Sequence, residues 1–395
     1  MGNTETELAP GAHVAVLRKA RGWSQAKLAR RAAVSVSLLS KIEIGDRALT
    51  PAVAAAVGQA LGVSMDQVLG RAPITPTDEQ HLEALRAAMR DYDLPDRQAV
   101  QEDLLSAALG QAHELRNRVD VTRLLAVLPP LLRDATTHAY RANTPAAWMI
   151  VAEAYSIAYW LAARHRWMDM AELAVTRQRW AVEQQPNPLG AAVACRDRAG
   201  TYLNFGDVER GLTLVDRAIA DAQHTLDSTD RDLAVCLLNL RGMTLAGRLR
   251  DNREAVREAE RHMQSAMATS QGMNRPLDVH GLTVGPQNVL AHRLATYVDL
   301  GKPHDALGLS DDLDQALTGM PATRVAPTHI NAARAHLDLG NRNDALTHLT
   351  TAWTVAPQMA RIHPMSRELF RVLSSLNQRS NAQLLTLSKL SGIPL

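Results

Sequence analysis

Residues 24–45, SQAKLARRAAVSVSLLSKIEIG, decide the fold of the N-terminal part of the chain. They hold two short amphipathic helical patterns joined by a tight connection. Ser24 and Ser35 stand at the two N-cap positions, where a side-chain oxygen can accept a hydrogen bond from the first turn. Leu28 and Leu39 lie on the inward faces. This pattern predicts a helix-turn-helix, whose second helix enters the DNA major groove.

The outward-facing side chains of this stretch are hydroxyl, amide and basic groups. Such groups donate hydrogen bonds to DNA phosphates and base edges. Residues 11–50 contain eight lysines and arginines but two acidic residues, although the whole chain has a formal net charge of only +2. The alternative is an ordinary helical hairpin in an all-α core. The local excess of positive charge favours DNA binding over that alternative.

The order of residues over about 11–70 closely resembles the Xre-like helix-turn-helix family, which includes the lambda-type phage repressors. The resemblance is carried by Leu17, Arg18, Arg21, Gly22, Trp23, Ser24, Gln25, Leu28, Ala29, Val34, Ser35, Leu39, Ser40, Ile42, Glu43, Gly45 and Arg47. It implies a five-helix, lambda-repressor-like domain that binds double-stranded DNA.

The resemblance also implies roles for single residues. Gln25 would brace the phosphate backbone and the recognition helix, and Val36 and Ser37 would stand where bases are read. Val36 departs from the glutamine or arginine common at its position, because it offers only an apolar contact. Arg47 resembles a phosphate clamp, and Glu43 is expected to pair with an arginine such as Arg47. The candidate DNA-contacting residues are Arg18, Gln25, Lys27, Ser35, Val36, Ser37, Ser40, Lys41 and Arg47.

Composition and helix-breaking residues divide the chain further. We expect residues 1–10 to be disordered and residues 11–70 to form the helix-turn-helix domain. Residues 71–78, RAPITPTD, form the predicted linker, since two prolines interrupt a helix there. Residues 79–395 are helical in pattern and poor in aromatic side chains, which make up 4% of the whole chain. The predicted fold class is therefore all-α, a small head followed by a helical-repeat domain.

A fixed offset runs through this second part. A residue that ends one helix is followed, five positions later, by a small residue in the next helix. The offset joins Gly206 to Gly211, Gly301 to Ala306 and Gly340 to Ala345, and more weakly Arg166 to Ala171 and Arg250 to Ala255. Glycine permits the left-handed turn that ends a helix, and the small residue lets the next helix pack closely. Over about 150–370 this resembles degenerate tetratricopeptide repeats, which implies an α-solenoid of stacked hairpins.

In tetratricopeptide arrays the first helix of each hairpin lines the concave surface. Counting back from the anchors places there Glu153, Trp160, Arg164, Arg196, Asn204, Arg241, Arg248, His292, Asn331 and Arg334. All of these except Glu153 and Arg248 are candidate ligand-binding residues. Asparagine amides can pair with peptide groups, and arginine can bind a carboxylate with two hydrogen bonds. The alternative is a solvated polar face with hydrogen bonds between repeats.

The aromatic-rich stretch 145–167 allows two interpretations, a ligand pocket or dimer face, and packing between repeats. No catalytic or metal-binding pattern stands out. A zinc-protease motif begins at His113 but has Asn117 where its second histidine is needed. Cys195 and Cys236 are expected to be core residues. We expect no cofactor, no enzyme activity and, since no leader or apolar run of membrane-spanning length is apparent, a cytoplasmic protein.

An Xre-like head joined to a tetratricopeptide body resembles the peptide-regulated, quorum-sensing transcription factors of Gram-positive bacteria. The resemblance implies a homodimer on a DNA operator with half-sites about 10 bp or a multiple apart. It also implies that a short signalling peptide binds the concave surface and changes the arrangement of the two heads. In the alternative, the repeats only dock another protein or dimerise, as in a repressor of a mobile or conjugative element.

Overall fold

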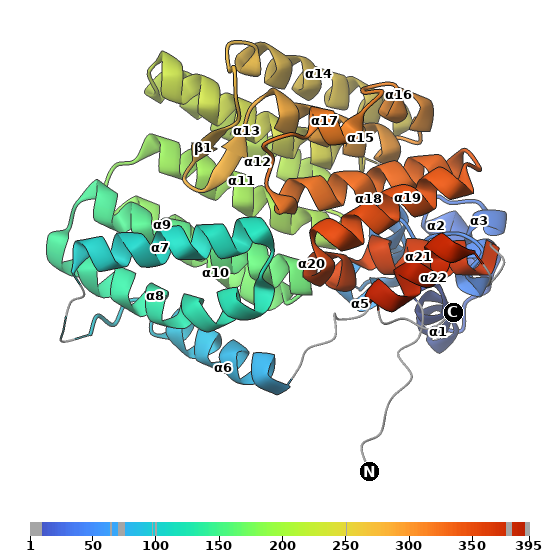
Figure 1. Cartoon of the computed structure of the whole chain (residues 1–395), viewed down its shortest axis with the longest axis horizontal. Helices are drawn as coiled ribbons and strands as arrows, with labels where there is room; N and C mark the ends of the chain where they lie inside the picture. The colour runs from blue at the N-terminus through green and yellow to red at the C-terminus, as the bar shows by residue number, and fades with distance from the viewer. Residues whose placement is uncertain are drawn as a thin grey trace.

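The computed structural model describes residues 10–63, 65–69, 76–96, 98, 101–249, 251–376 and 381–391. This part of the chain is almost entirely helical, with one small two-stranded hairpin (Figure 1). The predicted all-α fold class is confirmed. Residues 1–9, expected to be disordered, lie outside the described residues, as does the predicted linker from 71 to 75. The first helix already begins at Pro10, and the helix after the linker begins at Pro76.

The head, residues 10–69, contains the five predicted helices. They are α1 (Pro10–Ala20), α2 (Gln25–Arg31), α3 (Val36–Ile44), α4 (Pro51–Leu61) and α5 (Met65–Leu69). Ser24, Ser35 and Thr50 cap α2, α3 and α4, and each hydroxyl accepts a hydrogen bond of 3.0–3.2 Å from the backbone N–H three residues on. Leu28 and Leu39 are fully buried in the shared core. The local signals of capping and apolar spacing therefore positioned α2 and α3 correctly.

The connection between α2 and α3 contains two alanines with different roles. The two alanines after α2 look alike in the sequence, and both are small enough for a close helix approach. Ala32 is buried in the head core. Ala33 is exposed and has φ of 53°, in the left-handed region, so it forms the turn between α2 and α3.

The body, residues 76–391, contains the remaining elements. Its helices are α6 (Pro76–Arg90), α7 (Glu102–Arg118), α8 (Val121–Ala142), α9 (Pro145–His165), α10 (Met168–Gln184), α11 (Pro188–Phe205), α12 (Val208–Thr225), α13 (Ser228–Ala246), α14 (Asn252–Ser270), α15 (Pro286–Asp299), α16 (Pro303–Leu307), α17 (Leu313–Ala316), α18 (Ala322–Asp338), α19 (Arg342–Val355), α20 (Pro357–Ile362), α21 (Pro364–Leu376) and α22 (Ala382–Ser391). Strands β1 (Leu277–Val279) and β2 (Leu282–Val284) pair antiparallel, with Leu277 opposite Val284. This β-hairpin was not expected from the sequence.

The helices of the body pack in consecutive antiparallel pairs at the predicted anchors. Gly206, Gly301 and Gly340 take left-handed conformations after α11, α15 and α18, with φ between 69° and 81°. Arg166 has the same conformation after α9, with φ of 57°. The small partners Ala171, Gly211, Ala255, Ala306 and Ala345 are all buried. The anchor at position 250 lies outside the described residues. These pairs agree with the predicted repeat of helical hairpins.

The array of hairpins closes on itself, which the sequence did not predict. Helix α18 packs against α7, and α20 packs against α9. The side chain of Gln358 in α20 accepts a 2.8 Å hydrogen bond from the backbone N–H of Val121 at the start of α8. In Figure 1 the red C-terminal helices accordingly lie beside the green helices of the first half. The predicted concave surface is therefore the wall of an internal cavity.

Helix α9 is mostly buried in the hydrophobic core that it shares with α7, α8 and α10. Contrary to the sequence expectation, it is long and apolar enough to cross a membrane, the one such helix in the described part of the chain. In the structure 72% of its most apolar segment is buried. Trp148 and Tyr155 are among its buried side chains, and the ring of Trp148 meets that of Trp180 in α10 edge-on at 5.2 Å. Most of the aromatic stretch 145–167 thus packs between neighbouring hairpins.

Candidate nucleic-acid interface and internal cavity

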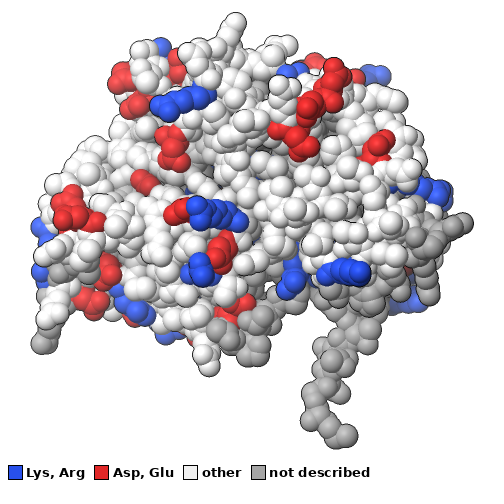
Figure 2. All heavy atoms as spheres, in the orientation of Figure 1, with Lys and Arg blue, Asp and Glu red and all other residues white. Residues whose placement is uncertain are grey.

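The outer face of α3 is open to solvent. Ser37 and Lys41 are exposed, Ser40 is half-buried, and the side chain of Val36 is 46% exposed. Ser35 is also exposed, and its hydroxyl caps the helix. In Figure 2 basic side chains lie at the edge of the molecule where Figure 1 places α3. This geometry leaves the predicted base-reading residues accessible to a DNA groove, and their contact with DNA remains a prediction.

The basic face of α2 is ordered by one aromatic ring. The ammonium of Lys27 lies 4.9 Å from the centre of the Trp23 ring, and the guanidinium of Arg31 lies 4.7 Å from it. Cation–π contacts of this kind hold flexible basic side chains over an aromatic face. Lys27 is half-buried, whereas Arg30 and Arg31 are exposed. Together with Lys41 these side chains form the cationic outer surface of the head.

Arg18, predicted to contact DNA, instead holds the head together. It is 8% exposed, and its Nε and Nη2 donate hydrogen bonds of 2.7 and 2.8 Å to the two carboxylate oxygens of Glu43. Its Nη1 donates at 2.7 Å to the carbonyl of Trp23. The hydrogen bond to Glu43 raises the pKa of Arg18. Arg18 is therefore corrected from a phosphate contact to a structural residue.

Glu43 has the expected structural role but not the expected partner. Arg18, rather than Arg47, pairs with it, and the Gln25 side-chain amide donates a second hydrogen bond at 2.8 Å. Burial opposes ionisation of this carboxyl, but the bonds from Arg18 and Gln25 hold its pKa below the usual value. Gln25 thus links α2 to the recognition helix as predicted, through Glu43. Its contact with a phosphate stays a prediction.

Arg47, the predicted phosphate clamp, contacts the body. Its Nη1 lies 3.1 Å from the Oδ1 atom of Asp338 at the end of α18, and both side chains are partly exposed. Two residues further on, the backbone N–H of Leu49 donates a buried 3.2 Å hydrogen bond to Glu368 of α21. Helices α4 and α5 also pack against α11. The head is therefore docked on the body beside its DNA-facing surface.

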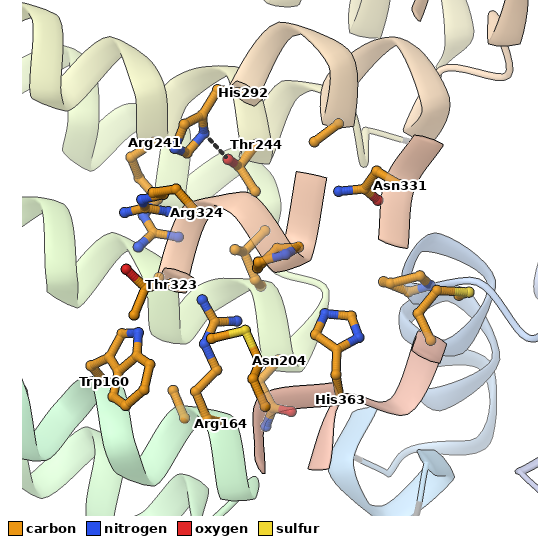
Figure 3. A pocket seen from close by; sticks show the side chains of 18 of the residues that line it. Trp160, Arg164, Asn204, Arg241, Thr244, His292, Thr323, Arg324, Asn331 and His363 are labelled. Atoms are coloured by element: carbon orange, nitrogen blue, oxygen red, sulfur yellow. Dashed lines mark hydrogen bonds between the residues drawn. The ribbon is translucent and has the colours of Figure 1, made fainter. Parts of the chain in front are cut away.

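The eight residues predicted to bind a ligand line one internal cavity of about 320 Å³. They are Trp160, Arg164, Arg196, Asn204, Arg241, His292, Asn331 and Arg334. Figure 3 labels Trp160, Arg164, Asn204, Arg241, His292 and Asn331 of this set, which converge from α9, α11, α13, α15 and α18 on one space. The volume lies within the range of pockets that hold small molecules. The positions counted back from the repeat anchors therefore belong to one cavity. Ligand binding by these residues remains a prediction.

Hydrogen bonds fix part of the cavity wall. The Nε of Arg241 donates at 3.1 Å to the carbonyl of Arg196, and the Thr244 hydroxyl lies 3.3 Å from the Nδ1 of His292. Burial and nearby arginines hold the pKa of His292 well below its usual value, so its ring is neutral at pH 7. Asn331 makes no hydrogen bond to another side chain that the structure describes, and its amide faces the cavity.

Glu153, also expected on the concave surface, lies outside this cavity wall. Its two carboxylate oxygens lie 2.7 Å from the Nε2 of His113 and 2.9 Å from the Nδ1 of His280, at the tip of the β-hairpin. Burial opposes its ionisation, but these two histidines lower the pKa of Glu153 to about 2. Glu153 therefore fastens the β-hairpin to α7 and α9 instead of facing a ligand.

Several residues of the cavity wall were not predicted from the sequence. Arg324 lies seven residues before Asn331 on α18, so the helical period could have placed both on one face. Arg116 comes from α7, outside the part of the chain where repeats were recognised. His363 lies at the turn between α20 and α21. Three residues of the head, Pro51, Met65 and Leu69, also line the cavity. No local signal could have shown that the head docks there.

Two other kinds of site receive no support. No group of three or more histidine, cysteine, aspartate or glutamate side chains in the described ranges could hold a metal ion. Cys195 and Cys236 are not bonded to each other, and Cys236 is buried. Burial raises the pKa of both thiols to about 11, so neither is a reactive thiolate at neutral pH. Cys236 is a core residue, as predicted, whereas Cys195 is half-buried and packs against the same core.

Comparisons with known proteins support the identity of the head. Residues 14–68 match the helix-turn-helix family. No curated protein sequence matches the chain. Among solved structures, the crystal structure of a PrgX/iCF10 complex aligns over 98% of both chains at 10% identity with a TM-score of 0.27. A PrgX mutant aligns over 96% of this chain and 99% of its own at 11% identity with a TM-score of 0.24.

These two structural scores are too low to carry an argument about the body. The family match, by contrast, covers α1 from Val14 onward and all of α2, α3 and α4, and it reaches Val68 in α5. It agrees with the five-helix geometry and with the open face of α3. Residues 14–68 of this chain therefore form a helix-turn-helix domain of the DNA-binding type.

Proposed function

We propose that the chain is a sequence-specific transcription regulator whose body binds an effector in the internal cavity and thereby changes DNA binding by the head. The observation that carries this proposal is the mixed origin of the cavity wall. Pro51, Met65 and Leu69 of the head line the same cavity as Arg164 and Asn331 of the body. A ligand in this cavity would contact both parts of the molecule at once.

The junction around the cavity supports the same coupling. The ion pair between Arg47 and Asp338 and the hydrogen bond from Leu49 to Glu368 hold the head in one orientation on the body. A ligand changes DNA affinity only if it binds one orientation more tightly than another. We propose that an effector in the cavity shifts this orientation.

We further propose that the effector is a short signalling peptide and that the regulator acts as a homodimer. The amides of Asn204 and Asn331 could pair with peptide groups, and the arginines could bind a carboxylate. One head presents a single short recognition helix, so two heads on a two-part operator would supply the necessary specificity. The closed array weighs against the alternative in which a folded protein docks in the concave surface, because α7 meets α18.

The test measures DNA binding and effector binding in the full chain. Fluorescence anisotropy gives the affinity for DNA from upstream of the gene, with and without synthetic peptides encoded beside the gene. A cognate peptide should change the Kd at least about fivefold, the lower end of typical allosteric coupling. Asn331→Ala should remove this effect without changing the affinity for DNA alone.

The matched control is Asn343→Ala, because Asn343 is an exposed amide on α19. It should behave like the unaltered chain in both measurements. The peptide proposal is wrong if no such peptide changes DNA affinity, or if Asn331→Ala and Asn343→Ala respond alike. Arg196→Ala is a poor variant for this test, because it would leave the buried carboxylate of Asp197 without its ion-pair partner.

A further inference from the structure

We propose that the effector carries at least two anionic groups, carboxylate or phosphate, and that unpaired arginines of the cavity wall bind them. This inference rests on the proposed function, since it names the chemistry of the ligand that the same cavity would take. It is carried by the charge of the wall, by the pairing of each charged group, and by the partial burial of the arginines.

The cavity wall has a large excess of positive charge. Eight arginines line it against two aspartates, Asp197 and Asp299. Burial lowers the pKa of His363 to about 3, so this histidine adds no positive charge at neutral pH, like His292. Buried charges in proteins are normally paired with opposite charges. The wall therefore contains far more cation than its own acids can neutralise.

Both aspartates already have partners. Asp197 accepts hydrogen bonds from Ser156 at 2.6 Å and from Gln178 at 3.2 Å, and it pairs with the neighbouring Arg196. Asp299 pairs with Arg334 at 2.6 Å and with Arg248 at 3.4 Å. Three of the eight arginines thus have a carboxylate partner, and neither aspartate is left to neutralise another.

Four other arginines of the wall have no carboxylate within ion-pair distance among the residues that the structure describes. They are Arg116, Arg164, Arg241 and Arg324. Arg116 donates to carbonyl and amide oxygens, and Arg241 donates to a backbone carbonyl. Arg164 lies 5.9 Å from the Trp160 ring. Hydrogen bonds to neutral groups orient these guanidinium groups but do not cancel their charge.

These arginines also repel one another. Burial, followed by the charges of Arg196, Arg164, Arg116 and Arg241, holds the pKa of Arg324 well below its usual value. Burial lowers the pKa of Arg241 and of Arg116 to about 10, which leaves both charged at pH 7. Figure 3 shows the guanidinium groups of Arg241 and Arg324 close together, with Arg164 extending into the same space. A bound anion would relieve this repulsion.

The residue type and the charge of the wall together indicate the chemical class of the ligand. The planar guanidinium fork matches the oxygens of carboxylate and phosphate groups. Arg164, Arg241 and Arg324 are half-buried, and reduced screening by water strengthens each such interaction. The four arginines come from four different helices, α7, α9, α13 and α18, and a singly charged anion would not balance their combined positive charge. A compact molecule with two or more anionic groups would.

The test uses defined anions and the full-length protein. Isothermal titration with citrate, pyrophosphate and an acetylated tetraglutamate amide separates carboxylate, phosphate and acidic-peptide sources of the same charge. The matched neutral probe is the tetraglutamine peptide. At least one anionic probe should bind, raise the Tm and weaken with added salt, whereas tetraglutamine should not bind.

The variant Arg324→Gln should lower the affinity for the anion at least tenfold. The Tm of the protein without a ligand should not fall, because the repulsion between the arginines is reduced. Arg164→Gln provides a second variant with the same expected loss. Arg123→Gln is the control, because the Arg123 side chain is 79% exposed on α8. The inference is overturned if none of the anions binds, if tetraglutamine binds equally well, or if both cavity variants bind like the control.

Measuring DNA affinity in the same samples separates this inference from the proposed function. An anion that binds through Arg324 but leaves DNA affinity unchanged supports the anionic site and contradicts the coupling. A neutral peptide that binds the cavity and changes DNA affinity supports the coupling and overturns the anionic site.

Discussion

The molecule has two cationic regions that differ in their exposure to water. On the head, Arg30, Arg31 and Lys41 are exposed on the outer faces of α2 and α3. In the body, Arg241 and Arg324 are half-buried and face the cavity. Exposed charges are screened by water and salt and act together on an extended polyanion such as DNA. Half-buried charges that line a cavity are screened less, so they favour a small anion that fits between them. We propose that the same residue types serve two different partners in these two regions.

The first prediction concerns the ion pair between Glu43 and Arg18. This pair is buried inside the head, and Arg18 belongs to neither cationic region. Glu43→Ala would leave the buried guanidinium of Arg18 without its carboxylate. Removing one partner of a buried ion pair costs about 3–5 kcal/mol, so the free energy of unfolding of the head should fall by about that much. Denaturant unfolding and amide hydrogen exchange of α1 to α3 measure the loss.

The control for this prediction is Glu114→Ala, which removes an exposed i,i+4 pair with Arg118 on α7. It should change stability by less than about 1 kcal/mol. If the two substitutions cost the same, Arg18 is not structural, and its assignment as a DNA contact has to be reconsidered.

The second prediction uses two glutamates with opposite pKa shifts. The pKa of Glu43 is lowered in the folded head, so its stabilising effect is present at neutral pH and is lost as pH falls through that lowered pKa. Burial raises the pKa of Glu368 in the folded protein. Its contribution to stability is therefore complete below the pKa of the unfolded state and is lost as pH rises through the pKa of the folded state. Glu368→Gln keeps an acceptor for Leu49.

Unfolding measured from pH 4 to 8 checks these signs. Relative to the unaltered chain, Glu368→Gln should gain stability toward neutral pH, because it avoids a buried charge at the head–body junction. Glu43→Gln should instead lose stability toward neutral pH. Equal pH profiles for the two variants would contradict the opposite roles of these carboxyl groups.

The third prediction concerns the exposed cationic region. Lys41→Ala should weaken binding to all DNA sequences and lower the slope of log K against log salt concentration by about 1, since one phosphate contact is lost. Ser37→Ala should change sequence preference and leave this slope unchanged. Binding to specific and random duplexes at several salt concentrations separates the two effects, and the reverse pattern would exchange the two roles.

The fourth and smallest effect concerns Arg47 at the boundary between the regions. Its ion pair with Asp338 is partly exposed, so breaking it should cost less than about 1 kcal/mol of stability. Asp338→Ala would release Arg47 toward a phosphate and should raise DNA affinity by up to about fivefold, the equivalent of 1 kcal/mol. Arg47→Ala should lower it, and equal affinities for both variants would exclude a role for Arg47 in DNA binding.

The sequence predicted features that depend on neighbouring residues. Caps at Ser24 and Ser35, glycine turns and helical periodicity placed the head helices and gathered eight cavity residues. It did not predict contacts between distant segments. The burial of Arg18 depends on Glu43, 25 residues away, and closure of the array depends on Gln358 meeting Val121. Such pairings leave no local pattern, because each side chain alone looks like an ordinary polar surface residue.

The division of roles between the two regions is tested most directly by selecting bound duplexes from a random DNA library with the full-length protein. The account predicts one enriched motif with two half-sites about 10 bp or a multiple apart. Ser37→Ala should change the bases of that motif, whereas Arg324→Gln should leave them unchanged. No enriched motif, or a motif that changes with Arg324 but not with Ser37, would contradict the account.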